Sequence, residues 1–191
     1  MKKINYYIIN ILIIFVQLLN VNTIGYSMEN KTIYEFKIQS ISGEELNLNQ
    51  YSGKAILLVN VASRCGFTKQ YKDLQKLWDI YNKKGLVVLG VTSNQFGSQD
   101  PSSNEDIKKF CKVNFNISFP MSLKYDVKGE NAHSIYKWAK ESYGKNAVPK
   151  WNFHKILIDK NGVVVDTFAS FTNPMSKKIT LKIEKILDWK A

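Results

Sequence analysis

The 191-residue sequence predicts an α/β fold with a central mixed sheet flanked by helices. Residues 55–61 and 86–91 are two nearly continuous apolar runs, which are typical of buried strands. The segment between them has helical spacing, so the three segments form a β-α-β unit with parallel strands. Near the C-terminus, two strand-like segments flank Asn161-Gly162, a pair that favours a hairpin turn and antiparallel strands.

A short hairpin is expected at the start of the domain. Residues 32–39 alternate between apolar and polar side chains as a strand does, and residues 46–50 look like the returning strand. Ser42-Gly43 supplies turn residues between the two. The central strand, residues 55–61, then follows.

The first helix is expected to start near Thr68 and to end before Gly85, a residue type common at helix C-termini. Its apolar residues recur at helical spacing. They are Tyr71, Leu74, Leu77, Trp78 and Tyr81.

A second helix is expected after the polar loop of residues 94–101. Ser102 and Glu105 form a capping-box pattern for a helix over residues 103–115, which carries Ile107, Phe110 and Cys111 on one side. Further helices are expected at residues 132–143 and 177–189, and strands at 153–158 and 163–168. This order of elements is typical of a thioredoxin-like layer fold.

Cys65 carries the strongest chemical signal in the sequence. It follows Ser63-Arg64 directly after the first buried strand, where we expect a tight turn and the first turn of a helix. Unpaired backbone N–H groups, the positive end of the helix dipole and the Arg64 guanidinium all stabilise a thiolate there. Because the thiolate is the reactive form of cysteine, Cys65 is a candidate nucleophile.

Composition excludes several classes of protein. The two cysteines, Cys65 and Cys111, are too few for a disulfide scaffold, so they form one bridge or remain two free thiols. The formal net charge of +11 comes mostly from scattered lysines without a basic stripe of interleaved aromatics, so we expect no nucleic-acid partner. The cysteines and the two histidines, His133 and His154, lack zinc-ligand spacing, and no glycine-rich nucleotide motif occurs. The sequence therefore predicts no metal and no cofactor.

Residues 1–30 are predicted to be an N-terminal targeting segment, and residues 31–191 the folded domain. Lys2-Lys3 precede an apolar stretch over residues 6–19, and small residues follow at Gly25 and Ser27, as in a secretory signal peptide. The chain is therefore expected in the secretory pathway or in an organelle reached through it. A signal anchor or a two-part organelle address are the alternatives, and translation from Met28 would give a cytosolic chain.

Four short sequence motifs occur one after another along the chain. They are residues 60–68 (Asn-Val-Ala-Ser-Arg-Cys-Gly-Phe-Thr), 94–97 (Asn-Gln-Phe-Gly), 119–120 (Phe-Pro) and 151–153 (Trp-Asn-Phe). With these strings the sequence resembles the glutathione peroxidases, in particular their cysteine-containing, thioredoxin-dependent branch. The similarity spans about residues 32–187. One departure is Thr92-Ser93, where members of the family usually carry Pro-Cys.

The resemblance implies a role for each residue of the candidate site. Cys65 corresponds to the peroxidatic cysteine, which is selenocysteine in some animal members. Gln95, Trp151 and Asn152 correspond to the three other residues of the catalytic tetrad. Amide and indole N–H groups are neutral donors that can stabilise charge at the sulfur and at the leaving oxygen. Cys111 stands where thioredoxin-dependent members carry their resolving cysteine.

The implied activity is the reduction of hydrogen peroxide and of organic or lipid hydroperoxides. Cys65 becomes a sulfenic acid, Cys111 converts it into an intramolecular disulfide, and thioredoxin reduces the disulfide. The short segment between Cys111 and Trp151 lacks the assembly loop of tetrameric animal enzymes, which implies a monomer and a weak glutathione site.

Other interpretations of the two cysteines stay open. Glutathione could resolve Cys65 and leave Cys111 as a small core residue, since it lies four positions after Ile107 and next to Phe110. Alternatively, oxidised Cys65 could pass its disulfide to a client protein, which would make the chain a redox sensor or relay. A hydrolase built on Cys65 and His154 is a further alternative, although no spacing supports it.

Overall fold

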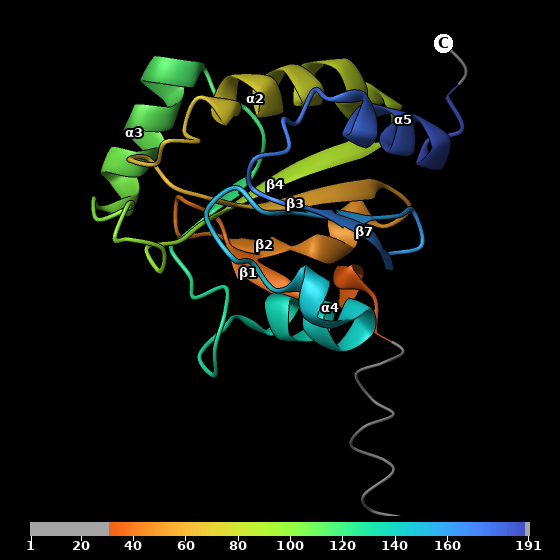
Figure 1. Cartoon of the computed structure of the whole chain (residues 1–191), viewed down its shortest axis with the longest axis horizontal. Helices are drawn as coiled ribbons and strands as arrows, with labels where there is room; N and C mark the ends of the chain where they lie inside the picture. Colours follow the sequence, from red (N-terminus) through yellow and green to blue (C-terminus); the bar gives the residue numbers. More distant parts are fainter. Residues whose placement is uncertain (1–30, 190–191) are drawn as a thin grey trace, which may run out of the picture. The chain divides into compact units, whose positions relative to one another are not determined.

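A five-stranded mixed sheet forms the centre of the protein in a computed structural model that describes residues 31–189 (Figure 1). The predicted targeting segment, residues 1–30, lies outside the described residues. The strand order is β5-β4-β3-β6-β7, in which β4 pairs in parallel with β3 and β5, whereas β6 is antiparallel to β3 and β7. The strands are β3 (Ala55–Val61), β4 (Leu86–Thr92), β5 (Met121–Ser122), β6 (Lys155–Ile158) and β7 (Val164–Phe168).

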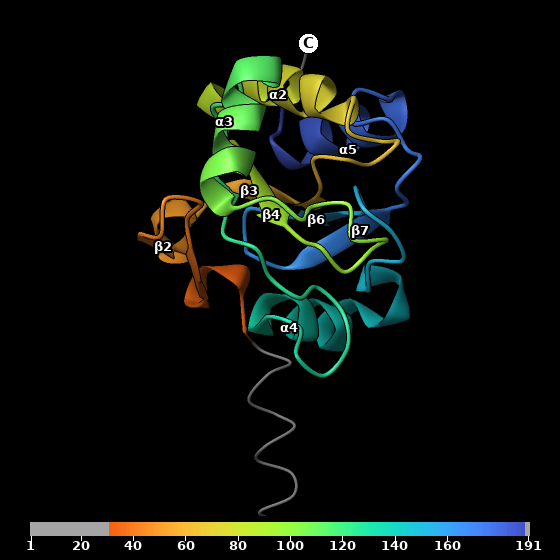
Figure 2. The same ribbon diagram turned by 90° about the vertical axis from the view of Figure 1, so that its left-hand side faces the viewer.

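Helices cover both faces of this sheet, as predicted. α2 (Gln70–Tyr81) and α5 (Lys177–Ile186) lie on one face with α3 (Asn104–Phe115) at its side, and α4 (Ser134–Tyr143) lies on the opposite face (Figures 1 and 2). None of the helices within residues 31–189 is long and apolar enough to cross a membrane.

Alternation along the central strand divides the apolar core into two halves. Leu57 and Val59 point to the face of α2, α3 and α5, whereas Ile56 and Leu58 point to the face of α4. Every residue of β3 and β4 is buried, which explains why both strands appear in the sequence as continuous apolar runs.

The N-terminal hairpin is shorter than predicted. Thr32 does not begin a strand, because its backbone N–H donates to the Glu35 carboxylate at 2.7 Å and caps a 3-10 turn over Ile33–Glu35. The strand β1 is therefore only Lys37–Gln39. Its partner β2 is Glu45–Asn47, and the Asn47 side chain then caps a second 3-10 turn, Leu48–Tyr51.

The predicted helix starts also change at two places. Ser103, not Ser102, caps α3: its Oγ accepts from the Asp106 N–H at 3.1 Å and donates to the Asp106 carboxylate at 2.8 Å. The predicted pair of Ser102 and Glu105 is therefore wrong by one position. Likewise α2 begins at Gln70 rather than at Thr68, because residues 63–69 form a series of turns.

The C-terminal hairpin confirms the prediction from Asn161-Gly162. The Asp159 carboxylate accepts from the N–H groups of Asn161 and Val163, and Gly162 has a φ of +81°. A Cβ at Gly162 would lie 2.7 Å from the Tyr34 ring, so glycine is required there for close approach as well as for its backbone conformation.

A buried lysine joins β6 to the segments that lead to the site. Lys155 is fully buried, and its Nζ donates to Gln70 Oε1 at 2.6 Å, to the Ser170 carbonyl at 3.2 Å and to the Thr172 carbonyl at 2.7 Å. Gln70 Nε2 also donates to the Ser170 carbonyl at 2.7 Å. Lys155 thus ties the first residue of α2 and the loop at 170–172 to the sheet.

This lysine makes stability depend on pH in a defined direction. Burial lowers the pKa of Lys155 from its ordinary 10.5 to about 7. Between these values the unfolded chain binds the extra proton, so the free energy of unfolding rises with pH by up to about 1.4 kcal/mol per pH unit. The free energy of unfolding is measured with urea at pH 7, 8 and 9. We expect it not to rise with pH in Lys155→Met, whereas the control Lys76→Met, at an exposed position, should show the same rise as the wild type. Parallel pH profiles of the wild type and Lys155→Met would contradict the prediction.

Candidate active site

Cys65 lies in a tight turn between β3 and α2, and Thr68 locks this turn. The Cys65 N–H donates to Thr68 Oγ1 at 2.9 Å, and the Thr68 hydroxyl donates in turn to the Ala62 carbonyl at 3.0 Å. The Thr68 N–H donates to the Cys65 carbonyl at 3.0 Å. The threonine in the Cys-Gly-Phe-Thr string therefore closes the turn from both sides.

A backbone amide, rather than the end of a regular helix, faces the sulfur. The Phe67 N–H donates to Cys65 Sγ at 3.4 Å. Because α2 begins only at Gln70, the predicted position of Cys65 in the first helical turn is wrong, and a turn amide supplies the donor instead. The Cys65 residue is 8% exposed, so a donor at its sulfur acts in surroundings largely shielded from water.

The residues just before Cys65 are anchored to the loop after β4. The Asp100 carboxylate accepts from the Ser63 N–H at 3.0 Å and from the Ser63 hydroxyl at 2.6 Å. The Arg64 N–H donates to the Gln99 carbonyl at 2.9 Å, while the exposed Arg64 guanidinium lies 3.4 Å from Ser102 Oγ. The loop after β4 thus fixes the position of the cysteine turn.

Asn60 holds the Trp151-Asn152-Phe153 segment against β3. Its Nδ2 donates to the Trp151 carbonyl at 3.1 Å, its Oδ1 accepts from the His154 N–H at 3.1 Å, and its carbonyl accepts from the Phe153 N–H at 2.6 Å. Phe153 has a φ of +63°, a conformation that needs such support. Sequence reasoning missed this role, although a polar residue inside an apolar strand was a usable signal.

We expect Asn60→Ala to weaken both activity and stability. The substitution leaves two buried backbone groups without side-chain partners, at a cost of about 1–3 kcal/mol in the free energy of unfolding. It also frees the segment that carries Trp151 and Asn152, so peroxide turnover should fall. Asn47→Ala, which removes a side-chain cap outside the site, is the control for the assay. Unchanged turnover in folded Asn60→Ala would refute the expected link to activity.

Asn152 and Trp151 lie against the loop after β4. Asn152 is fully buried, and its Nδ2 donates to Gln99 Oε1 at 3.0 Å and to the Phe96 carbonyl at 3.4 Å. Asn152 Oδ1 is buried without a hydrogen-bond partner among the described residues. Trp151 is 40% exposed and its ring lies 5.9 Å from that of Phe96. Gln99 therefore connects Asn152 to the cysteine turn, a role that the sequence did not suggest.

Gln95 has a different set of partners from the one expected. Its Oε1 accepts from the N–H groups of Val127 at 2.7 Å and Lys128 at 3.0 Å, and its Nε2 donates to the Lys128 carbonyl at 3.1 Å. The structure thus brings Trp151 and Asn152 onto the loop that holds the cysteine turn, while the Gln95 amide anchors the base of this loop to residues 127–128.

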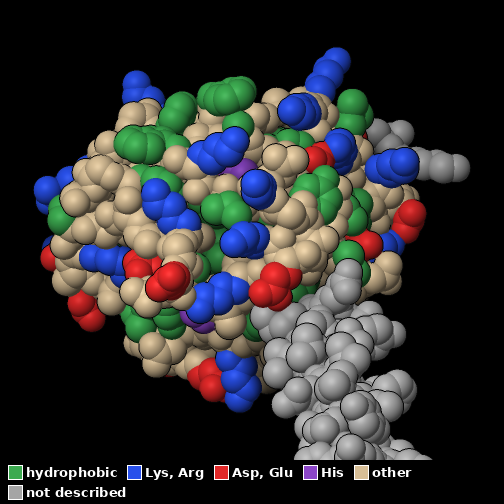
Figure 3. Space-filling view, turned by 60° about the horizontal axis from the view of Figure 1, so that its bottom comes forward, with side chains coloured by type: hydrophobic (Ala, Val, Ile, Leu, Met, Phe, Trp, Pro, Cys, Tyr) green, Lys and Arg blue, Asp and Glu red, His purple; other side chains and the backbone are tan. Residues whose placement is uncertain are grey.

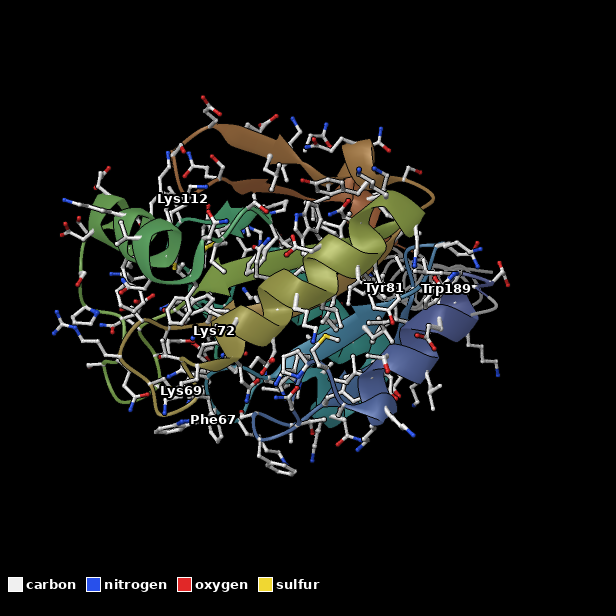
Figure 4. The ribbon with its side chains drawn as sticks, turned by 90° about the horizontal axis from the view of Figure 1, so that it is seen from above. Phe67, Lys69, Lys72, Tyr81, Lys112 and Trp189 are labelled. Atoms are coloured by element: carbon white, nitrogen blue, oxygen red, sulfur yellow. The ribbon has the colours of Figure 1, made fainter. Side chains whose placement is uncertain are left out.

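A cavity of about 390 Å³ opens beside the cysteine turn. Phe67, two residues after Cys65, lies on its wall, and Phe67 and Lys69 lie near one end of α2 in Figure 4. Phe171 is 78% exposed at the rim. A largely apolar opening of this kind suits the alkyl part of an organic hydroperoxide. The other lining residues are Asn146, Lys150, Trp151, His154, Thr167, Ala169 and Ser170.

His154 lines the same cavity, but its surroundings disfavour the Cys65–His154 hydrolase alternative. Burial, followed by the positive charge of Lys155, lowers the pKa of His154 to about 4. An imidazole with such a pKa is a weak base near neutral pH. Cys65 instead forms hydrogen bonds within its own turn, with Phe67 and Thr68.

Cys111 is buried in α3 within the same half of the core as Cys65. Both thiols are free, and Cys111 is 1% exposed. Burial raises the pKa of the Cys111 thiol to about 11, and the Asp100 carboxylate adds to this rise, whereas the Tyr71 hydroxyl opposes it. Cys111 is therefore a core residue in this state, and its reaction requires local opening of α3.

The distribution of surface charge and of possible metal ligands was compared with what a nucleic-acid or metal site requires. Lysines are spread over the face that Figure 3 shows and are interrupted by acidic side chains. Within residues 31–189, no cluster of three or more histidine, cysteine or acidic side chains could hold a metal ion.

Comparisons with known proteins identify a family to which the chain is similar over most of its length. The glutathione peroxidase family model matches residues 33–140. Glutathione peroxidase-like peroxiredoxin 2 of Saccharomyces cerevisiae is 45% identical over 149 residues, which cover 76% of this chain and 91% of the yeast protein. Hydroperoxy fatty acid reductase gpx1 of Synechocystis sp. is 39% identical over 166 residues, covering 83% of this chain and 97% of that protein.

Solved structures give the same result for the fold. The apo crystal structure of Trgpx superposes with a TM-score of 0.67 at 38% identity and covers 85% of this chain and 99% of its own. Together with the strand order, this confirms the predicted thioredoxin-like α/β fold.

Proposed function

Because the chain belongs to the glutathione peroxidase family and is a peroxidase, we propose that it reduces hydrogen peroxide and organic or lipid hydroperoxides through Cys65, with Cys111 as resolving cysteine and thioredoxin as reductant. The names of two relatives, a peroxiredoxin and a hydroperoxy fatty acid reductase, support the thiol chemistry and the lipid substrate. The observation that carries the proposal is the Phe67 N–H aimed at the Cys65 sulfur in a turn that opens beside an apolar cavity.

The first step is attack of the Cys65 thiolate on one oxygen of the peroxide. The S–O bond forms as the O–O bond breaks, and the leaving alkoxide or hydroxide takes up a proton to give alcohol or water. The Phe67 N–H stabilises the thiolate before attack. In the proposal, the Trp151 indole N–H stabilises the charge that develops on the leaving oxygen. Asn152, whose Nδ2 donates to Gln99 and to the Phe96 carbonyl, holds the segment that carries Trp151 in place.

The second step regenerates the thiol through a disulfide. Cys111 attacks the Cys65 sulfenic acid, which releases water and forms a disulfide between the two residues. A dithiol of the thioredoxin class then reduces this disulfide. The presence of Cys111 in the same core half as Cys65 supports this route.

Electron-donor preference tests the proposal most directly. We would measure steady-state reduction of tert-butyl hydroperoxide by the full chain, with thioredoxin or glutathione as the donor. Faster turnover with thioredoxin is expected, because its dithiol reduces the Cys65–Cys111 disulfide in a single encounter, whereas two molecules of the monothiol glutathione must react in succession. Faster turnover with glutathione would assign the chain to a glutathione-dependent mechanism. Peroxide consumption only when a client protein is supplied would assign it to a redox relay.

Compartment and assembly belong to the same proposal. We propose that residues 1–30 direct the chain into the secretory pathway or an organelle reached through it, and that the enzyme acts as a monomer. Imaging of full-length and Met28-start fusions tests the targeting. Light scattering of the purified full chain tests the oligomeric state.

A further inference from the structure

Gln99 contacts both parts of the candidate site through two separate groups. Its backbone carbonyl accepts from the Arg64 N–H at 2.9 Å, directly before Cys65. Its side-chain Oε1 accepts from Asn152 Nδ2 at 3.0 Å, directly after Trp151. Because both bonds belong to one residue, the position of Gln99 limits how far the cysteine turn and the Trp151-Asn152 segment can move apart.

The loop that carries Gln99 is fixed on both sides of this residue. Gly97 and Ser98, which precede it, have φ angles of +63° and +50°. A serine in the left-handed region costs free energy and persists only where the surrounding structure holds it. Asp100, which follows, is fully buried and accepts from the N–H and the hydroxyl of Ser63. Gln99 is therefore presented to the site from a constrained backbone.

The Gln99 side chain lies beside the Trp151 ring, over Gly97. A Cβ added at Gly97 would lie 3.5 Å from Gln99 Nε2 and 3.6 Å from Trp151 Cη2. Asn152, which Gln99 holds, is fully buried, whereas Trp151 is 40% exposed. A half-exposed ring has few buried contacts of its own, so its position depends on the anchored residue beside it.

We propose that Gln99 is a positioning residue for peroxide reduction, because it sets the separation between the Cys65 sulfur and the Trp151 indole N–H. The inference rests on the proposed function, in which Cys65 attacks the peroxide and Trp151 stabilises the leaving oxygen. Gln99 forms no covalent bond and transfers no proton in this step. It acts through Asn152 and through the backbone of Arg64.

Replacing Gln99 by methionine tests this role. Methionine is close to glutamine in length but has no carbonyl acceptor, so Asn152 Nδ2 keeps only its longer bond to the Phe96 carbonyl at 3.4 Å. The backbone bond from Arg64 to residue 99 does not depend on the side chain. Gln99→Met should therefore loosen the Trp151-Asn152 segment and leave the cysteine turn in place.

Two reactions of the reduced full chain are compared in each variant. The first is the loss of one equivalent of hydrogen peroxide over a single turnover, which depends on the leaving oxygen. The second is alkylation of Cys65 by iodoacetamide, located by peptide mass spectrometry, in which iodide leaves and no N–H donor is needed. Gln75→Met on α2 is the matched control, since it removes side-chain bonds to Ser118 outside the site.

We expect Gln99→Met to reduce hydrogen peroxide about tenfold more slowly than the wild type, because a displacement of about 1 Å can cost up to about a hundredfold in rate. The rate of Cys65 alkylation should stay the same. Gln75→Met should match the wild type in both reactions. An equal fall of both rates in Gln99→Met would show general loosening and overturn the proposal, as would an unchanged peroxide rate.

A double-mutant cycle shows whether Gln99 acts through Asn152. If it does, the double variant of Gln99→Met and Asn152→Ala reduces peroxide about as slowly as Asn152→Ala alone. Losses that multiply fully in the double variant would mean that the two residues act independently, and would refute this route.

Failure of the inference is distinguishable from failure of the proposed function. Peroxide loss that persists in Cys65→Ser would refute the proposed function, and the role of Gln99 with it. Peroxide loss that depends on Cys65 but proceeds at the wild-type rate in Gln99→Met overturns the role of Gln99 alone.

Discussion

Replacing Cys65 by serine is expected to abolish peroxide reduction with every electron donor. A serine hydroxyl is not ionised near neutral pH and does not replace a thiolate as the nucleophile toward an O–O bond. Loss of a reacting nucleophile lowers kcat by at least about a thousandfold. Turnover of hydrogen peroxide and tert-butyl hydroperoxide should therefore fall to background with thioredoxin and with glutathione alike.

The fold of this variant should stay intact, since serine is close in size to cysteine and the turn is held by backbone groups. The hydrogen bonds from the Cys65 N–H to Thr68 and from the Thr68 N–H to Cys65 do not involve the sulfur. Circular dichroism and the urea midpoint check this. A folded Cys65→Ser protein with substantial turnover would place the peroxidatic group elsewhere.

Replacing Cys111 by serine is expected to separate the first step from the rest of the cycle. One peroxide per enzyme should still be consumed, because Cys65 and its turn are unchanged. Thioredoxin-driven turnover should stop, since no intramolecular disulfide forms. The measurement is a burst experiment with limiting enzyme, followed by steady-state rates with each donor. Unchanged steady-state turnover would make Cys111 a structural residue.

Valine 113 offers a control on the same helix. Val113 is 73% exposed, so Val113→Ser alters the solvent face of α3 and should leave both phases of the burst experiment unchanged.

Amide hydrogen exchange tests whether α3 opens when the protein is oxidised. We expect α3 to lose protection in oxidised wild type, because buried Cys111 reaches Cys65 only if the helix opens. Equal protection in the oxidised and reduced proteins would contradict this opening.

Local signals in the sequence were sufficient for the centre of the fold. The apolar runs of β3 and β4 and the Asn161-Gly162 turn each predicted an element that the structure confirms. These signals succeed because burial on both faces of a parallel strand and the left-handed conformation of a tight turn restrict residue type at the position itself. Thr32 and Ser103 show the limit, since capping bonds shift the start of the first strand by five residues and the cap of α3 by one.

The resemblance to a family proposed the members of the candidate site, whereas the contacts between them could not be read from the sequence. The proposed members are Cys65, Gln95, Trp151, Asn152 and Cys111, of which the structure holds Cys65, Trp151 and Asn152 on neighbouring loops. The clamp by Asn60 and the anchor from Gln95 to residues 127–128 could not be predicted, because each joins positions far apart along the chain.

The sequence by itself therefore determined the class of fold and the family, and it marked Cys65 as the candidate nucleophile, because these depend on residue type and order. Only the tertiary structure decided what surrounds that thiol. It showed a turn amide rather than a helix end at Cys65, and it showed Cys111 fully buried in the core. The physical reason is that hydrogen bonding and desolvation depend on distance in space, which chain folding sets and local sequence does not.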